Sequence, residues 1–350
     1  MRTQQRLLTS LIVMVMTSAQ VHASQWKMLL DLRGDWKIEL GDSAHWADPR
    51  YDDRGWETIT VPSRWEDQGF PGYDGYAWYR KHFRAETKLL ASMVHVHLGY
   101  VDDVSEVYIN GHLIGFAGRF PPHFYAGSSL VSYQYYSIPQ EYIRYDEDNV
   151  IAVRVFDLRL AGGLVGPKMG LFEPADYLWP DVLLEGRWKF RTGDDSLWST
   201  PSFNDTQWSS ILVPGYMEAQ GYRDYDGFAW YRLAFGIPAE FAEDHMVLLL
   251  GKVDDVDELY VNGTFIGRTG HVPENQDRSE LSTEWLIPRT YTIPPGILKA
   301  GTTNTIAVRV LDVWMHGGIY DGPVGLVRRE NYMEWKNKKS GIKKFFEWLW

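Results

Sequence analysis

Two short polar patterns in this 350-residue sequence could take part in ligand binding. Each is an arginine inside an apolar run, followed three residues later by an aspartate: Arg154 with Asp157, and Arg309 with Asp312. Such a pair can form an ion pair at the end of a domain. It can also donate and accept hydrogen bonds with the hydroxyl groups of a ligand. The sequence leaves both interpretations open.

Aromatic residues gather with aspartates and histidines in the loops around these runs. A sugar ring has an apolar C–H face, so a site that binds it needs an exposed aromatic ring and a few polar groups that orient the hydroxyls. The alternative is that these side chains only pack against their neighbours. The candidate ligand-binding residues are Tyr73, Asp74, Tyr76, His123, Arg154 and Asp157 in the first half, and Tyr225, Asp226, Phe228, His271, Arg309 and Asp312 in the second. Loop residues of the same kind are Phe120, Phe124, Tyr125, Tyr222 and Asp224.

Candidate catalytic residues do not form a recognisable set. Asp102–Asp103 and Asp254–Asp255 are adjacent carboxylates, but neighbours entering a strand point to opposite faces, and glycoside hydrolysis needs two carboxylates facing each other across a bond. Ser43 follows Gly41–Asp42 in a pattern known from one class of esterases, but the second half has Asp195 at this position. The sequence has no cysteine, which excludes thiol catalysis and disulfides. We therefore predict no catalytic residue and no enzyme activity.

The elements that must position these side chains occur twice. Residues 101–115 recur almost unchanged as residues 253–267, and in both copies alternating apolar residues run into Asn-Gly and out again. This pattern predicts a β-hairpin, because Asn and Gly tolerate the positive φ angles of a tight turn. A repeat of about 150 residues has the size of a whole domain. Each half should therefore bury its own core.

Alternating short runs, many Trp and Tyr residues and frequent turn dipeptides predict an all-β chain. Neither copy contains a sustained helical pattern. In the run 94–98, the alternation predicts that Val94, Val96 and Leu98 enter the core while His95 and His97 face solvent or a neighbouring module. The predicted domains are residues 24–174 and 175–330, and the short aromatic link between the copies, residues 173–181, should pack against the protein.

The motifs shared by the two copies resemble the sugar-binding jelly-roll domain of family 2 glycoside hydrolases of the β-galactosidase and β-glucuronidase type. They include Trp36, Val61-Pro62, Ala77-Trp78-Tyr79-Arg80, the Asn110-Gly111 hairpin and the run from Asn149 to Val155. The second copy, with Arg289–Pro294 followed by Gly317-Gly318, also looks like the sandwich inserted in sialate O-acetylesterases. The resemblance covers residues 26–173 and 181–329. It implies two tandem jelly-roll β-sandwiches of the galactose-binding-like type.

In those enzymes the catalytic residues lie in another domain, and the two jelly rolls leave no room among these 350 residues for a barrel of about 250 residues. The resemblance implies no cofactor. Sandwiches of this type often hold a structural calcium ion, but no acidic loop here has a recognisable ligand spacing.

The two ends of the sequence differ from the repeats. Residues 1–23 have the features of a signal peptide: Arg2 and Arg6, an apolar run, and Val21-His22-Ala23 as a cleavage site. The mature chain should be exported, either periplasmic or secreted. Residues 331–350 form a basic and aromatic tail outside the second sandwich. Three interpretations stay open for it: a segment at a membrane interface, a docking peptide for a protein, or the approach to a membrane span.

The formal net charge of −11 argues against a nucleic-acid partner. We therefore predict an exported, non-catalytic carbohydrate-binding protein with a glycan or glycoside ligand. One alternative is a protein of carbohydrate metabolism related to glycoside hydrolases or acetylesterases. Another is a membrane-tethered sensor or scaffold ectodomain.

Overall fold

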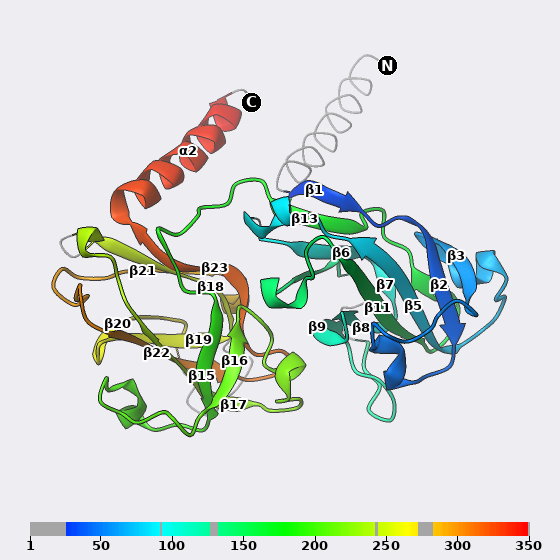
Figure 1. The fold of residues 1–350 in the computed structure, drawn as a ribbon, viewed down its shortest axis with the longest axis horizontal. Coiled ribbons are helices and arrows are strands. Elements are labelled where there is room, and N and C mark those ends of the chain that lie inside the picture. The colour runs from blue at the N-terminus through cyan, green and yellow to red at the C-terminus, as the bar shows by residue number, and fades with distance from the viewer. Residues whose placement is uncertain (1–25, 92, 127–131, 242–243, 272–282, 349–350) are drawn as a thin grey trace, which may run out of the picture. The chain divides into compact units, whose positions relative to one another are not determined.

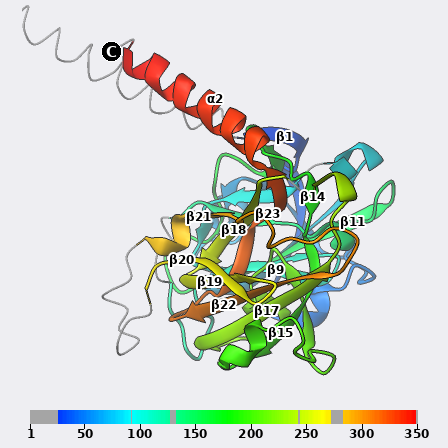
Figure 2. The ribbon, with the colours of Figure 1, turned by 90° about the vertical axis from the view of Figure 1, so that its left-hand side faces the viewer.

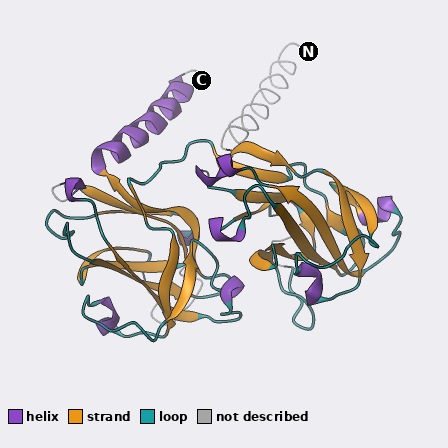
Figure 3. Ribbon diagram, viewed as in Figure 1, coloured by secondary structure: helices purple, strands orange, loops and turns teal. Residues whose placement is uncertain are grey.

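The fold is that of a computed structural model (Figure 1). The structure describes residues 26–91, 93–126, 132–241, 244–271 and 283–348, so the predicted signal peptide lies outside the described residues. The chain divides between Tyr177 and Leu178 into two compact units. In both units the main regular element is the strand, and short helical turns occur in the loops (Figure 3).

The first unit contains a six-stranded antiparallel sheet in the order β3-β2-β5-β11-β8-β9 and a four-stranded sheet in the order β1-β13-β6-β10. A small third sheet, β4-β12-β7, lies at the end of the unit where β5 begins and β11 ends. The strands are β1 (Trp26–Asp31), β2 (Gly34–Leu40), β3 (Glu57–Val61), β4 (Ser63–Arg64), β5 (Gly75–Arg84), β6 (His95–Gly99), β7 (Val101–Asp102), β8 (Val104–Ile109), β9 (His112–Ala117), β10 (Gln134–Ser137), β11 (Asp148–Asp157), β12 (Gly163–Leu164) and β13 (Gly170–Pro174).

The second unit repeats this topology. Its six-stranded sheet has the order β16-β15-β17-β22-β19-β20, which matches the first unit strand for strand, and its four-stranded sheet has the order β14-β23-β18-β21. The strands are β14 (Val182–Leu183), β15 (Gly186–Thr192), β16 (Ser209–Val213), β17 (Gly227–Phe235), β18 (Met246–Asp254), β19 (Val256–Val261), β20 (Thr264–Thr269), β21 (Pro288–Thr292), β22 (Asn304–Asp312) and β23 (Gly318–Arg328). The predicted all-β class and tandem sandwiches are confirmed.

The predicted hairpins form at the two Asn-Gly pairs. Asn110 and Gly111 have φ angles of 50° and 85°, and Asn262 and its glycine have almost the same values. The Asn110 side chain also fixes the hairpin to the next strand, because its Oδ1 accepts a hydrogen bond from the Val150 N–H at 2.9 Å and its Nδ2 donates to Asn149 at 2.8 Å. The same bonds join Asn262 to β22.

Each core lies between the two large sheets of its unit. In the second unit, alternate residues of the six-stranded sheet meet alternate residues of the four-stranded sheet, so one face of each sheet is apolar. Trp78 and Trp230, which lie on the other face of their sheets, are each 1% exposed and pack beneath loop residues, as expected for core side chains.

The prediction for the two histidines of β6 was wrong. His95 and His97 are each only 1% exposed, because aromatic rings on the neighbouring strands cover this face of the sheet. The Trp26 ring of β1 lies 4.8 Å from His95 and 4.5 Å from His97, and the Phe172 ring of β13 lies 4.4 Å from His97. Burial lowers the pKa of His97 to about 3. Alternation shows which residues share a face, but not what covers that face.

Helix α2 (Arg329–Trp348) begins immediately after β23 and extends beyond the sheets of the second unit (Figure 2). The link between the copies contributes Leu178, which packs with Tyr332 of α2 against the apolar side chains of Val247, Leu249 and Val327, as predicted for a packed linker. Within the described part of the chain, no helix has both the length and the apolar character that a membrane span requires.

Candidate functional site

A buried arginine fixes the loop that covers the outer face of each six-stranded sheet. Arg80 of β5 is fully buried and donates from Nε to the Asp53 carboxylate at 2.7 Å and from Nη1 to the carbonyl oxygens of Trp46 and Asp48. In the second unit, Arg232 makes the same contacts with Asp205 and with two loop carbonyls. The repeated Trp-Tyr-Arg motif is therefore explained by loop anchoring.

A second arginine on the same face lies close to the end of the first sandwich. The register pairs Arg154 of β11 with Trp78 of β5, two residues from Tyr76. The Arg154 guanidinium donates to both Asp42 oxygens, at 2.8 and 2.5 Å, and from Nη1 to Glu106 at 3.1 Å. Burial alone would raise the pKa of Asp42, but the hydrogen bonds from Arg154 and Trp78 outweigh it and lower this pKa.

Aromatic rings lie against this guanidinium. The Arg154 Cζ atom is 4.1 Å from the Phe120 ring centroid and 4.9 Å from that of Tyr76, and the two rings are nearly parallel, 8° apart. In the second unit, Arg309 binds Asp194 and Glu258 in the same way, and its Cζ lies 4.0 Å from the Phe228 ring. In each unit, two carboxylates thus hold an arginine, and an aromatic ring lies against its guanidinium group.

The predicted ion pairs Arg154–Asp157 and Arg309–Asp312 do not form. Residues three apart in a strand point to opposite faces, so each arginine lies on the outer face while its aspartate turns inward. Asp157 and Asp312 are 0% and 1% exposed. Their Oδ1 atoms accept hydrogen bonds from the backbone N–H groups of Arg159 and Trp314, whereas their Oδ2 atoms have no hydrogen-bond partner within the described residues.

Asp157 belongs to a cluster of carboxyl groups at this end of the first sandwich. Burial, with contributions from the nearby Asp103 and Asp74, raises the pKa of Asp157 to about 6. Burial, together with a hydrogen bond to Asp103, raises the pKa of Asp102 to about 7. The expectation that Asp102 and Asp103 point apart was wrong, because their carboxyl groups lie close enough to interact.

The second unit has an equivalent cluster of carboxyl groups, in which the pKa values are raised further. Burial, with the charges of Glu218 and Asp226, raises the pKa of Asp312 to about 9. Burial raises the pKa of Glu218 to about 8, and neither of its carboxylate oxygens makes a hydrogen bond of ordinary geometry among the described residues. Burial also raises the pKa values of Asp254 and Asp255. With these pKa values, Glu218 and Asp312 hold protons near neutral pH and can then act as hydrogen-bond donors.

Glu66 and Glu218 were not predicted from the sequence. The signal that could have identified them is that they occupy equivalent positions in the two copies. Glu66 accepts hydrogen bonds from the Gly162 N–H at 3.1 and 3.3 Å. The N–H of the equivalent Gly317 acts on Glu218 and opposes the effect of burial on its pKa. The role of Glu106 as a partner of Arg154 was also not predicted from the sequence.

The other predicted residues divide into anchors and exposed groups. The hydroxyls of Tyr73 and Tyr225 donate to the backbone carbonyls of Tyr76 and Phe228, at 2.8 and 2.6 Å, so they fix the turns that precede β5 and β17. The first residues of β5 and β17 pair with Asp157 and Asp312, the last residues of β11 and β22. The two tyrosines, the arginines and the buried aspartates therefore lie at one end of each sandwich. The exposed candidates are Asp74, His123, Asp226 and His271.

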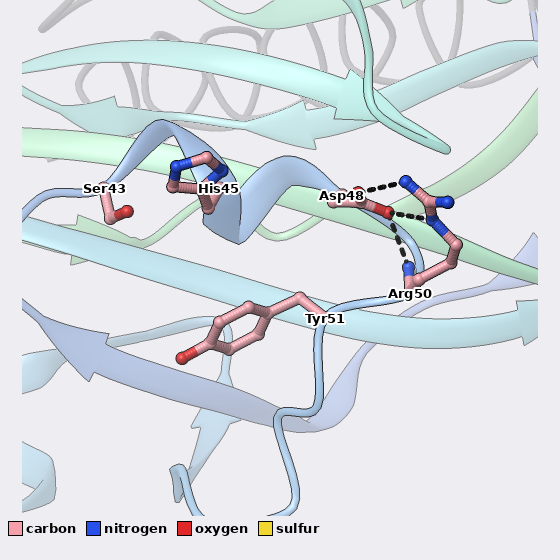
Figure 4. Close-up of a pocket in the computed structure, with 5 residues that line it drawn as sticks. All are labelled: Ser43, His45, Asp48, Arg50 and Tyr51. Atoms are coloured by element: carbon pink, nitrogen blue, oxygen red, sulfur yellow. Dashed lines mark hydrogen bonds and ion pairs between the residues drawn. The ribbon is translucent and has the colours of Figure 1, made fainter.

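An open depression in the first unit is lined by Ser43, His45, Asp48, Arg50 and Tyr51 (Figure 4). The Asp48 carboxylate is occupied by the Arg50 side chain, at 3.1 and 2.9 Å, and by its backbone N–H at 2.8 Å. In Figure 4, dashed lines join the Asp48 carboxylate to Arg50 and none joins it to the His45 ring. The backbone N–H of Asp48 donates to the His45 carbonyl oxygen at 3.1 Å. These groups therefore lack the hydrogen-bonded chain of an acyl-transfer triad.

Among the residues that the structure describes, no group of three or more His, Asp or Glu side chains is arranged to hold a metal ion.

The sequence matches the family described as the beta-galactosidase second all-beta domain, over residues 40–160 and again over residues 193–315. The chain belongs to this family. The two matched segments follow the internal repeat, so each sandwich is one family domain.

Curated relatives share part of the chain. It is 31% identical over 139 residues to beta-galactosidase BoGH2A of Bacteroides ovatus, covering 36% of this chain and 15% of that protein. It is 26% identical over 149 residues to a beta-glucuronidase of Formosa agariphila, covering 39% of this chain and 14% of that protein. The chain therefore matches only about one seventh of the length of these relatives.

Solved structures are similar to the chain at low identity. The chain is 17% identical to Bacteroides uniformis beta-glucuronidase 2, with a TM-score of 0.35, over 82% of this chain and 28% of that structure. It is 15% identical to a glycosyl hydrolase family 2 member from Bacteroides cellulosilyticus, again with a TM-score of 0.35.

Proposed function

We propose that the chain is an exported protein that binds a glycan or glycoside without cleaving it. One observation carries this proposal: the same end of each sandwich presents an aromatic ring held against an arginine, beside an exposed aspartate. The relatives that share these domains are named as a beta-galactosidase and a beta-glucuronidase, enzymes of β-linked sugars.

The geometry of this end suits a sugar ring. All the guanidinium bonds of Arg154 that the structure shows are made to Asp42 and Glu106, so this side chain serves to hold the Tyr76 and Phe120 rings rather than to bind ligand hydroxyls directly. A sugar would place its C–H face on an aromatic ring and donate its hydroxyls to an exposed carboxylate such as Asp74. In the second unit, Phe228 and Asp226 would have these roles.

Hydrolysis is disfavoured by the spacing of the acids. Glycosidases hold two carboxyl groups about 5 to 10 Å apart to accommodate the sugar and, in inverting enzymes, a water molecule. Asp102 and Asp103 are close enough to share a hydrogen bond, and the Asp157 side chain is fully buried. The glycosidase relatives extend far beyond the matched segment, so catalysis would depend on parts of those proteins that this chain does not match.

The two copies should differ in the ligand they prefer. In the second unit the Tyr216 and Tyr320 rings are stacked 5.0 Å apart, and His316 lies 5.3 Å from Tyr216. None of these rings is present at the equivalent positions of the first unit, which are Arg64, Val165 and Ala161. We therefore expect any binding by isolated copies to show distinct specificities.

The test is a glycan-array screen of the chain from Ser24 to Trp350, beside the double variant Tyr76→Ala, Phe228→Ala. We expect binding that is reduced at least tenfold in the double variant, since stacking on an aromatic ring supplies much of the contact. Phe265→Ala is the matched control, because Phe265 is a half-exposed aromatic residue beside the Asn262 hairpin turn, at the other end of its strand pair. Absence of binding by the folded chain contradicts the function, and equal binding by the double variant contradicts the site.

A further inference from the structure

Helix α2 carries a charge opposite to that of the rest of the chain. Residues 329–350 contain six of the 35 Lys and Arg residues but only three of the 46 Asp and Glu residues. They also contain Tyr332, Trp335, Phe345, Phe346, Trp348 and Trp350. A cationic, aromatic segment therefore follows two strongly acidic domains.

The start of this helix is fixed to the second sandwich. The Asp181 carboxylate accepts hydrogen bonds from the Arg328 N–H at 2.7 Å and from the Asn331 amide at 3.2 Å. Tyr332 packs against the apolar side chains that also receive Leu178. The helix axis thus has a defined origin on the domain and extends beyond it (Figure 2).

Farther along, lysines lie over aromatic rings of the helix itself. Lys336 Nζ is 5.7 Å from the Tyr332 ring centroid, and Lys339 Nζ is 4.2 Å from that of Trp335. In this arrangement an aromatic ring lies within one helical turn of an ammonium group. Side chains at a membrane surface combine the same two properties, because aromatic rings favour the headgroup level while lysines reach anionic lipid headgroups.

From these observations we infer that α2 docks the chain on an anionic lipid surface. A helix of 20 residues is about 30 Å long. Its lysines and aromatic rings suit a helix that lies along the lipid surface. The acidic sandwiches would be repelled by anionic lipid, so contact would be restricted to the helix and the domains would remain in the aqueous phase. This inference does not depend on glycan binding.

Vesicle co-sedimentation tests the inference. We expect the chain from Ser24 to Trp350 to bind vesicles of phosphatidylglycerol and phosphatidylcholine, and to bind pure phosphatidylcholine on the order of tenfold less or weaker. Binding should also fall on raising the salt concentration from 0.1 to 0.5 M, because screening weakens charge attraction.

Two sets of variants make the outcome specific. Lys336→Glu with Lys339→Glu should abolish most of the vesicle binding, whereas Lys299→Glu, on the body of the second sandwich, should leave it unchanged. Circular dichroism and thermal unfolding establish that each variant remains folded. Three outcomes would each overturn the inference: equal binding to neutral and anionic vesicles, unchanged binding of the double variant, or no binding to either vesicle. The last outcome would favour a protein partner.

Discussion

At the scale of single residues, burial decides what each arginine contributes. The Arg80 side chain is fully buried and its partner Asp53 is nearly so, with side-chain exposures of 0% and 9%. The equivalent pair, Arg232 and Asp205, has exposures of 2% and 27%. Removing one partner of a buried ion pair leaves an uncompensated charge, and the cost falls as solvent reaches the remaining group.

We therefore expect Arg80→Leu to lower the free energy of unfolding of the first sandwich by about 3–5 kcal/mol. Arg232→Leu should destabilise the second sandwich less, because water can solvate Asp205. Urea unfolding of each variant, followed by tryptophan fluorescence, measures both effects. An equal loss in the two variants would show that exposure of the acid is not the deciding factor.

At the scale of elements, an asparagine in each copy joins a hairpin to the next strand. Asn110 combines a positive φ angle with hydrogen bonds to Val150, to Asn149 and to the Tyr142 carbonyl. It therefore serves the turn through its backbone and the strand pairing through its side chain. Its counterpart Asn262 does the same.

The variant Asn110→Ala should lower the free energy of unfolding of the first sandwich by about 1–3 kcal/mol, because buried groups lose their hydrogen-bond partner. Asn110→Asp, which keeps an acceptor for the Val150 N–H but loses the amide donor, should be less harmful at low pH than at neutral pH. Thermal unfolding at pH 4 and pH 7 distinguishes the two variants. A stability loss below about 0.5 kcal/mol for Asn110→Ala would contradict this role.

At the scale of the whole molecule, the two carboxyl clusters make stability depend on pH. In the folded protein the pKa is about 6 for Asp157 and about 7 for Asp102, and it is about 8 for Glu218 and about 9 for Asp312. Each is above the usual value near 4 in an unfolded chain. The protonated carboxyl therefore stabilises the fold fully below about pH 4, and this contribution is lost as pH rises to the folded-state pKa.

We expect the urea midpoint of the first sandwich to fall between about pH 4 and pH 7 and then level off, while that of the second keeps falling to about pH 9. Surface acids such as Asp31, whose hydrogen bonds from Arg33 lower its pKa to about 2, have the opposite effect below pH 4. Asp312→Asn should flatten the profile of the second sandwich and leave that of the first unchanged. A profile of the second sandwich that is flat from pH 5 to pH 9 would contradict the assignment of buried, protonated acids.

The sequence alone was sufficient for the repeat, the all-β class, the Asn-Gly hairpins and the buried Trp78 and Trp230. These features depend on local periodicity and on comparison of one copy with the other, both of which are present in the linear order of residues. The sequence also identified many of the polar and aromatic residues that gather at the end of each sandwich. It did not show how they are paired.

The pairing was decided by tertiary structure. Arg154 binds Asp42, which is 112 residues away in sequence, rather than the nearby Asp157. His95 and His97 are buried by rings from other strands, and the acids of each cluster come from separate loops and strands. The alternation of a strand fixes which side chains share a face, whereas the groups that meet on that face depend on how distant segments pack.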